Sequence, residues 1–127
     1  MVIAVWSRKE SFDMQLNETE KKADFIADRL KIFFGKRVDN VVIENVIDVP
    51  GHTYFSIKFK AYNYFAVRLN YGVGSFGCCI CTGGIGVGLD NSQKYWDTAD
   101  FDVFFKELKQ EIELRIPDKF LKAKGWL

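Results

Sequence analysis

Acidic residues are missing from the middle of this 127-residue sequence. No aspartate or glutamate occurs from position 49 to position 89, although the chain has 17 of them in all. The same stretch carries His52, Lys58, Lys60 and Arg68, so it is mildly basic. Both flanks mix acids and bases, and the formal net charge is only +1. This balance gives no overall attraction toward nucleic acid or a membrane.

Histidine and long apolar runs are also scarce. With one histidine beside a Pro-Gly turn, no serine in a nucleophile elbow and no carboxylate pair in the basic stretch, a hydrolase triad has no obvious members. No apolar run is long enough to span a bilayer, and the short apolar start has no basic residue before it. We therefore expect no membrane segment, no signal peptide and a cytoplasmic location.

Three cysteines, Cys78, Cys79 and Cys81, lie close together. Neighbours on a strand point to opposite faces, and an odd number leaves a free thiol in any case. With His52 they supply four candidate metal ligands, but Cys-Cys-x-Cys lacks the paired spacing of a zinc site. We expect small apolar side chains in a reduced protein, with no metal and no cofactor.

Composition and alternation predict a single α+β domain over residues 1–127, because 48% of the residues are hydrophobic and 16% aromatic. Residues 54–60 and 64–71 alternate apolar and polar side chains, which predicts two half-buried strands joined by a turn at Tyr62 and Asn63. The side chains expected on the buried face are Phe55, Ile57, Phe59, Phe65, Val67 and Leu69.

Two more strands are expected at residues 76–82 and 85–89, joined by a tight turn at Gly83 and Gly84. Glycines at positions 84, 86 and 88 leave one face of the last strand without side chains, which is typical of a bulge or a close backbone approach. Such a strand at a sheet edge can pair with a second copy, so a homodimer is one expectation. Neither a following helix nor Gly-Lys-Ser/Thr supports a phosphate loop here.

An earlier strand over residues 36–49 is apolar on both faces. Simple alternation assigns Val41, Ile43 and Ile47 to one face, and Val42 and Val46 to the other. The strand then ends at the Pro-Gly turn of residues 50–51.

An N-terminal helix is predicted to begin at Asn17, which with Glu20 forms a capping-box pattern, and to end at Gly35. Phe25 and Ile32 add a second apolar stripe, which favours a helix packed on both the sheet and another helix. The first stripe consists of Ala23, Ile26, Ala27, Leu30, Phe33 and Phe34. The pattern of the first six residues fits a strand as well as a helix.

A C-terminal helix is predicted after Asp97 or Thr98 as the cap, with a break at Pro117, a short second helix and Trp126 folded onto the core. Its apolar side is formed by Phe101, Phe104, Phe105, Leu108 and Ile112. The expected architecture is an antiparallel meander of about five strands, with the N-terminal and C-terminal helices packed on one sheet face.

The outward face of the central strands carries the candidate binding residues. Tyrosine and arginine are favoured at protein interfaces, and lysines attract acidic partners. The hypothesis is a non-catalytic module that binds a protein with an acidic surface, such as a bacterial toxin-neutralising (immunity-type) or regulatory protein. The same residue types also populate solvent-facing strand positions without any function. The candidates are Tyr54, Lys58, Lys60, Tyr62, Tyr64, Arg68 and Asn70.

Two alternatives remain open from the sequence. The same aromatic and basic groups can stack the bases and neutralise the phosphates of single-stranded RNA or DNA, although three basic residues are few for this purpose. Asp48 and Lys58 at neighbouring strand ends also suggest a metal-dependent nuclease, with Glu44 as the second carboxylate.

Overall fold

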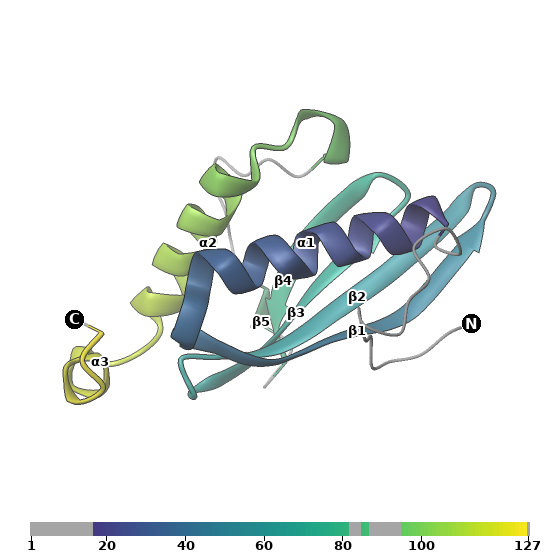
Figure 1. Cartoon of the computed structure of the whole chain (residues 1–127). Coiled ribbons are helices and arrows are strands. Elements are labelled where there is room, and N and C mark those ends of the chain that lie inside the picture. The colour runs from purple at the N-terminus through teal and green to yellow at the C-terminus, as the bar shows by residue number, and fades with distance from the viewer. Residues whose placement is uncertain (1–16, 82–84, 87–94, 127) are drawn as a thin grey trace.

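The structure is a computed structural model of the chain, and it describes residues 17–81, 85–86 and 95–126. It has the α+β architecture that the sequence predicts (Figure 1). Short 3-10 turns at Gly35–Arg37 and Trp96–Thr98 precede β1 and α2. The elements are α1 (Glu18–Phe34), β1 (Val38–Val49), β2 (His52–Ala61), β3 (Phe65–Gly72), β4 (Ser75–Ile80), β5 (Ile85–Gly86), α2 (Phe101–Leu114) and α3 (Asp118–Ala123).

The strands form one antiparallel sheet in the order β1-β2-β3-β4-β5, so the predicted meander is confirmed. β5 has two residues and pairs with β4 at the edge of the sheet. The rest of the predicted glycine-rich strand, and the tight turn at residues 83–84, lie outside the described residues.

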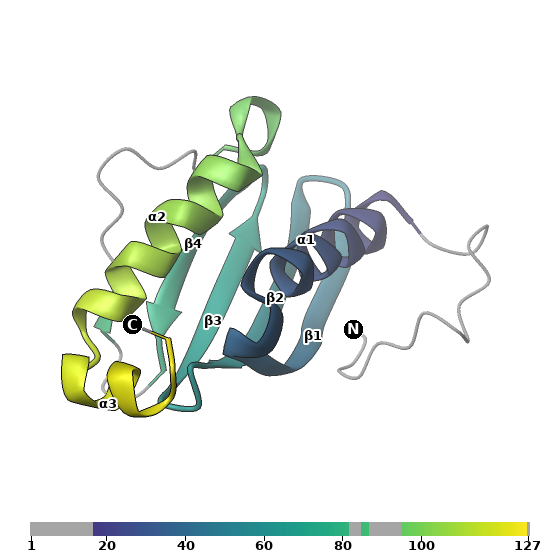
Figure 2. The ribbon, with the colours of Figure 1, turned by 60° about the vertical axis from the view of Figure 1, so that its left-hand side comes forward.

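Both long helices cover the same face of the sheet. Figure 2 shows α1 in front of β1 and β2, and α2 in front of β3 and β4. The apolar side predicted for α2 is buried in full, and so is most of the first stripe of α1. The buried side chains of the central strands, Phe55, Ile57, Phe59, Val67 and Leu69, point toward this helical layer and are at most 1% exposed.

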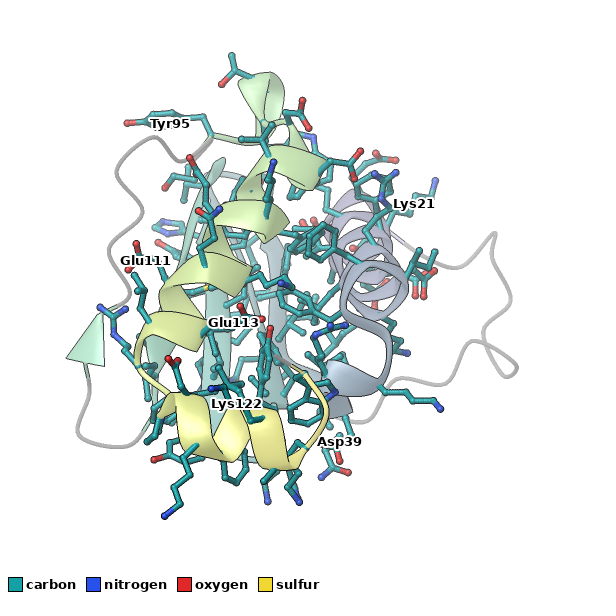
Figure 3. The ribbon with its side chains drawn as sticks, turned by 90° about the vertical axis from the view of Figure 1, so that its left-hand side faces the viewer. Lys21, Asp39, Tyr95, Glu111, Glu113 and Lys122 are labelled. Atoms are coloured by element: carbon teal, nitrogen blue, oxygen red, sulfur yellow. The ribbon has the colours of Figure 1, made fainter. Side chains whose placement is uncertain are left out.

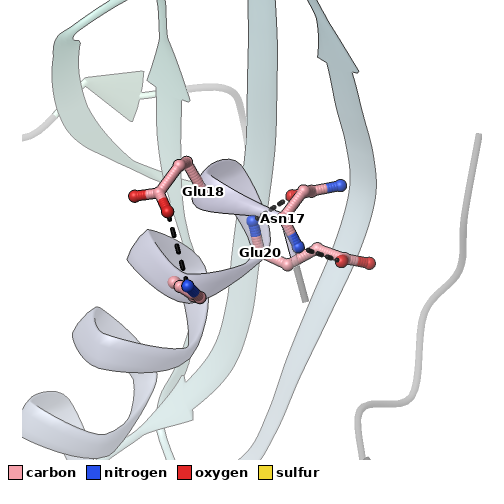
Figure 4. A network of polar contacts seen from close by, with 4 residues as sticks. Asn17, Glu18 and Glu20 are labelled. Atoms are coloured by element: carbon pink, nitrogen blue, oxygen red, sulfur yellow. Dashed lines mark hydrogen bonds and ion pairs between the residues drawn. The ribbon is translucent and has the colours of Figure 1, made fainter. Parts of the chain in front are cut away.

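The start and the end of α1 follow from local chemistry. The Asn17 side chain accepts a hydrogen bond from the Glu20 amide, and the Glu20 carboxylate accepts one from the Asn17 amide, at 2.7 and 3.0 Å (Figure 4). Thr19 donates to Asp48 of β1 at 2.6 Å, which ties the first turn to the sheet. Gly35 ends the helix with a φ of 57°, a conformation that glycine adopts at little cost. The predicted capping box and stop are confirmed.

The second apolar stripe of α1 is confirmed in part. The Phe25 ring packs edge-on against Trp96 and Phe101, with ring centroids 5.8 and 5.7 Å apart, and so contacts the α2 layer. Ile32, in contrast, is 79% exposed. The helix therefore contacts both the sheet and α2, but its stripe is narrower than the sequence suggests.

The C-terminal helices differ from prediction at one cap. Asp100 caps α2, because its side chain accepts hydrogen bonds from the backbone amides of Asp102 and Val103. Asp97 and Thr98 belong to the preceding 3-10 turn. Pro117 stands at the start of α3, as expected. Trp126 folds back onto the core, as predicted.

β1 departs from simple alternation, so its predicted faces are wrong. Asn40 and Asn45 each have a φ of 54°, and each accompanies a shift in register against β2. A bulge of this kind places two residues opposite one and moves every later side chain to the other face. As a result Ile43 and Val46 are both buried beneath α1, whereas Ile47 pairs with Tyr54 on the opposite face.

The bulge at Asn45 gives a direct test of this strand. Asn45 is exposed and has a left-handed backbone, which a β-branched residue tolerates poorly. We expect Asn45→Val to lower the free energy of unfolding by about 1–2 kcal/mol, and Asn45→Gly to change it by less than about 0.5 kcal/mol. Chemical denaturation measures both. Asp39→Val, at an exposed position of ordinary φ in the same strand, is the control, and an equal loss there would contradict the bulge.

Candidate functional site

The face of the sheet opposite α1 and α2 is called the open face below. Its membership follows from cross-strand register, because paired residues in an antiparallel sheet point to the same side. The rows across the strands begin with Tyr54 and Gly72, then Ser56 and Asn70, then Lys58 and Arg68. Its described members are Asp39, Val42, Glu44, Ile47, Val49, His52, Tyr54, Ser56, Lys58, Lys60, Ala66, Arg68, Asn70, Gly72, Ser75, Gly77 and Cys79.

The structure brings five of the predicted site residues together on this face, namely Tyr54, Lys58, Lys60, Arg68 and Asn70. They come from the adjacent strands β2 and β3. A further predicted residue lies apart from this group. Tyr64 precedes β3 in the turn, and its ring packs edge-on against Phe65 and Phe120 at 4.8 and 4.9 Å, so it lies at the rim next to α3.

Tyr62 was predicted on the open face, and this is wrong. Its side chain is 0% exposed, and its ring packs against Trp126 at 5.2 Å. The hydroxyl donates a hydrogen bond to the Glu113 carboxylate at 2.5 Å. Figure 3 labels Glu113 on α2. The alternation of β2 stops one residue earlier, and a φ of 57° at Tyr62 turns the side chain toward the helices. Burial and the Glu113 carboxylate raise the pKa of Tyr62 above its usual range.

The open face has mixed charge because β1 contributes acidic side chains. Glu44 lies across β2 from Arg68, and its carboxylate is 3.5 Å from the guanidinium. Asp39 is opposite Lys60 in the register. The mild positive charge of the central strands is therefore partly neutralised by their neighbour, which the run of basic residues in the sequence did not reveal.

Hydrogen bonds between side chains order the centre of this face. Ser56 donates to Asn70 at 2.8 Å, and the Asn70 amide lies 3.9 Å from the sulfur of Cys79 on β4. These contacts link three strands on one surface. Cross-strand pairs of this kind restrict the motion of the side chains.

Tyr54 is held in place by a glycine on the next strand. A methyl group added at Gly72 would come within 2.7 Å of a Tyr54 ring carbon, so the ring lies over the Gly72 backbone. The opposite end of this row carries a second tyrosine. Tyr95 forms an isolated bridge with Ser75 and is 65% exposed (Figure 3). Because the partners of an antiparallel bridge point to the same side and Ser75 belongs to the open face, Tyr95 also points to that side.

A hollow lies at the other end of the open face. It has a volume of about 460 Å³ and is lined by residues of β1, β2 and β3. Since the Phe59 side chain is buried on the helical side, its main chain contributes to the floor. The other lining residues are Asn40, Val42, Glu44, Lys58, Lys60 and Ala66.

The nuclease arrangement predicted from Asp48 and Lys58 is not present. Asp48 accepts the hydrogen bond from Thr19 on α1, so its carboxylate faces the helices, whereas Lys58 points to the open face. Within the described ranges, no group of three or more histidine, cysteine, aspartate or glutamate side chains is placed to hold a metal ion. The three cysteines are free, and burial raises the pKa of Cys78 above its usual range.

No protein-family model matches the sequence, and no curated protein and no solved structure shows significant similarity to it. Among the described helices, none is long and apolar enough to cross a membrane.

Gly72→Ala tests the placement of Tyr54. The added methyl group cannot coexist with the ring, so we expect the ring to move off β3 while the free energy of unfolding falls by less than about 1 kcal/mol, because the ring is half exposed. The NMR shifts of the Tyr54 ring protons report the movement. Gly77→Ala on the same face is the control, since nothing lies within 4 Å of its added methyl group.

Tyr62→Phe tests the buried hydroxyl. Loss of its hydrogen bond to Glu113 is expected to lower the free energy of unfolding by about 1–2 kcal/mol at neutral pH. Because the pKa is raised on folding, this tyrosine stabilises the fold below the unfolded pKa of about 10, and the contribution is lost as pH rises above that value.

Denaturation between about pH 8 and about pH 10.5 should therefore show a steeper loss of stability in the natural sequence than in Tyr62→Phe. Tyr64→Phe, which removes an exposed hydroxyl, should keep the steeper slope. Identical slopes for all three proteins would contradict the buried, carboxylate-bonded hydroxyl.

Proposed function

We propose that this protein is a non-catalytic protein-binding module that holds one partner against its open face. The observation that carries the proposal is the asymmetry of the sheet: α1 and α2 cover one face, and ordered aromatic, charged and polar side chains occupy the other. Rigid scaffolds that present preordered groups lose little entropy on binding. Tyr54 and Arg68 are the residue types that contribute most to protein interfaces.

Single-stranded nucleic acid fits the open face less well. Base stacking needs several aromatic platforms, and the described part of this face carries Tyr54 at one row with Tyr95 at its far end. Tyr62, which would have been a third aromatic platform, is buried. Phosphates would also meet Glu44 and Asp39 beside the lysines. A protein partner can match positive and negative groups in register, which a uniformly anionic strand cannot.

The kind of partner follows from this pattern of charge. A surface that is acidic opposite Lys58 and Lys60 but not acidic throughout would complement both the lysines and Glu44. Toxin-neutralising (immunity-type) and regulatory proteins both act by occupying a partner surface without chemistry. We propose that this chain acts in the same way, by covering a surface of its partner. The proposed location is the reducing cytoplasm of a bacterium.

Site-specific photocrosslinking tests the proposal in the cells of origin. With p-benzoylphenylalanine in place of Tyr54, we expect one discrete cross-linked product, because position 54 lies in the proposed contact. The same residue in place of Ile32, which is 79% exposed on the helical side, should give none. Adding Arg68→Glu to the first variant should remove the product by reversing a charge on the same face.

Equal products from both positions, or none from position 54, would contradict the proposal. A product of twice the mass of the chain would identify a second copy as the occupant and would overturn the separate partner.

A further inference from the structure

The hollow on the open face owes its shape to two features of the sequence. The bulge at Asn40, with its φ of 54°, inserts an extra residue opposite Phe59 and bends the edge strand β1. On β3, the residue paired with Lys60 is Ala66. Its side chain is small and leaves an empty volume above the strand, whereas the long side chain of Arg68, two residues later, fills the equivalent space. The hollow is therefore built at one end of the face, between a bulged edge and a small residue.

The lining of this hollow carries two lysines and one acid, Glu44, and Asp39 lies opposite Lys60 in the register. Lys58 and Lys60 are two residues apart on one face of β2, so their Cα atoms are about 7 Å apart. Because both side chains are long and flexible, one carboxylate can contact both ammonium groups. Within the described part of the chain, neither lysine forms an ion pair. Glu44, the acid in the lining, is instead paired with Arg68 at 3.5 Å.

We infer that the hollow receives the carboxylate of an aspartate or glutamate side chain of the partner protein. Lys58 and Lys60 pair with the carboxylate, the amide of Asn40 donates a hydrogen bond, and the methylene stem rests on Val42 and Ala66. This inference rests on the proposed function and adds the chemistry of the partner's anchor. A side chain that enters a well-packed pocket typically contributes more to binding than the contacts around it.

The lining favours a carboxylate over a phosphate. A phosphate carries nearly two charges and three acceptor oxygens, and its bidentate recognition favours the fork of an arginine over the point charge of a lysine. Here the cations in the lining are two lysines, the Arg68 guanidinium is held by Glu44, and the Glu44 carboxylate itself lies in the lining. A singly charged group on an apolar stem meets less repulsion than a dianion.

NMR titration of the whole chain tests the anchor without knowledge of the partner. The probe is the blocked residue N-acetyl-glutamate N-methylamide, and its neutral isostere N-acetyl-glutamine N-methylamide is the control. We expect saturable shifts of the amides of residues 40, 42, 58, 60 and 66 with the first probe, and affinity about tenfold weaker or undetectable with the second. Equal responses to both probes, or shifts elsewhere on the molecule, would overturn the inference.

Two variants complete the test. Lys58→Gln with Lys60→Gln should abolish the difference between the probes, whereas Lys31→Gln with Lys106→Gln, both exposed on the helical side, should preserve it. Tighter binding of inorganic phosphate or of an oligouridylate at the same residues would overturn the carboxylate assignment.

Photocrosslinking from position 54 separates this inference from the proposed function. If the product persists in the Lys58→Gln, Lys60→Gln variant at undiminished yield, the anchor is wrong while the binding face stands. If position 54 gives no product although the glutamate probe binds, the binding face is wrong and the hollow is a site for free carboxylates.

Discussion

The aromatic layer between the two long helices and the sheet is the interaction on which the rest of this structure depends. Phe76 of β4 stacks on Phe101 of α2 with ring centroids 5.3 Å apart, and Phe105 lies 5.7 Å from Phe33 of α1. These contacts join both helices to each other and to one sheet face, and large buried rings stabilise such a layer strongly. Because both helices pack on the same face of the sheet, the side chains of the open face are not covered by them.

That second face is ordered by the sheet itself. Tyr54 lies over Gly72, Ser56 is hydrogen bonded to Asn70, and Glu44 is paired with Arg68, so long side chains are restrained by their cross-strand neighbours. The bulges of β1 make this surface uneven. They also hinder the edge strand from pairing with strands of other chains. The proposed binding role rests on this ordered and uneven surface.

Local rules predicted much of this fold, and they placed five of the candidate residues on the face opposite the helices. The capping box at Asn17, the glycine stop of α1 and the strict alternation of β2 are set by neighbours in sequence, so their faces follow from the sequence alone. Positions with left-handed backbone do not obey alternation. Asparagine at position 45 shifts β1 by one residue, and Tyr62 turns inward for the same reason.

Other misses depend on pairing between distant segments. Nothing local to Tyr95 reveals its bridge to Ser75, and nothing local to Asp48 reveals its bond to Thr19. The mixed charge of the open face was missed similarly, because Glu44 lies outside the basic stretch in sequence and enters it only through the register of β1. Each of these features can be predicted only when the pairing and register of the strands are known.

Hydroxyl-radical footprinting of the tyrosines measures the central claim, an accessible face opposite the helices, within one molecule. The account predicts rapid oxidation of Tyr54 and Tyr95, which are 41% and 65% exposed, and protection of Tyr62 and Tyr71, which are 0% and 3% exposed. Addition of the partner should then protect Tyr54 selectively. Protection of Tyr54 in the free protein to the level of Tyr62 would contradict an open sheet face and the binding role built on it.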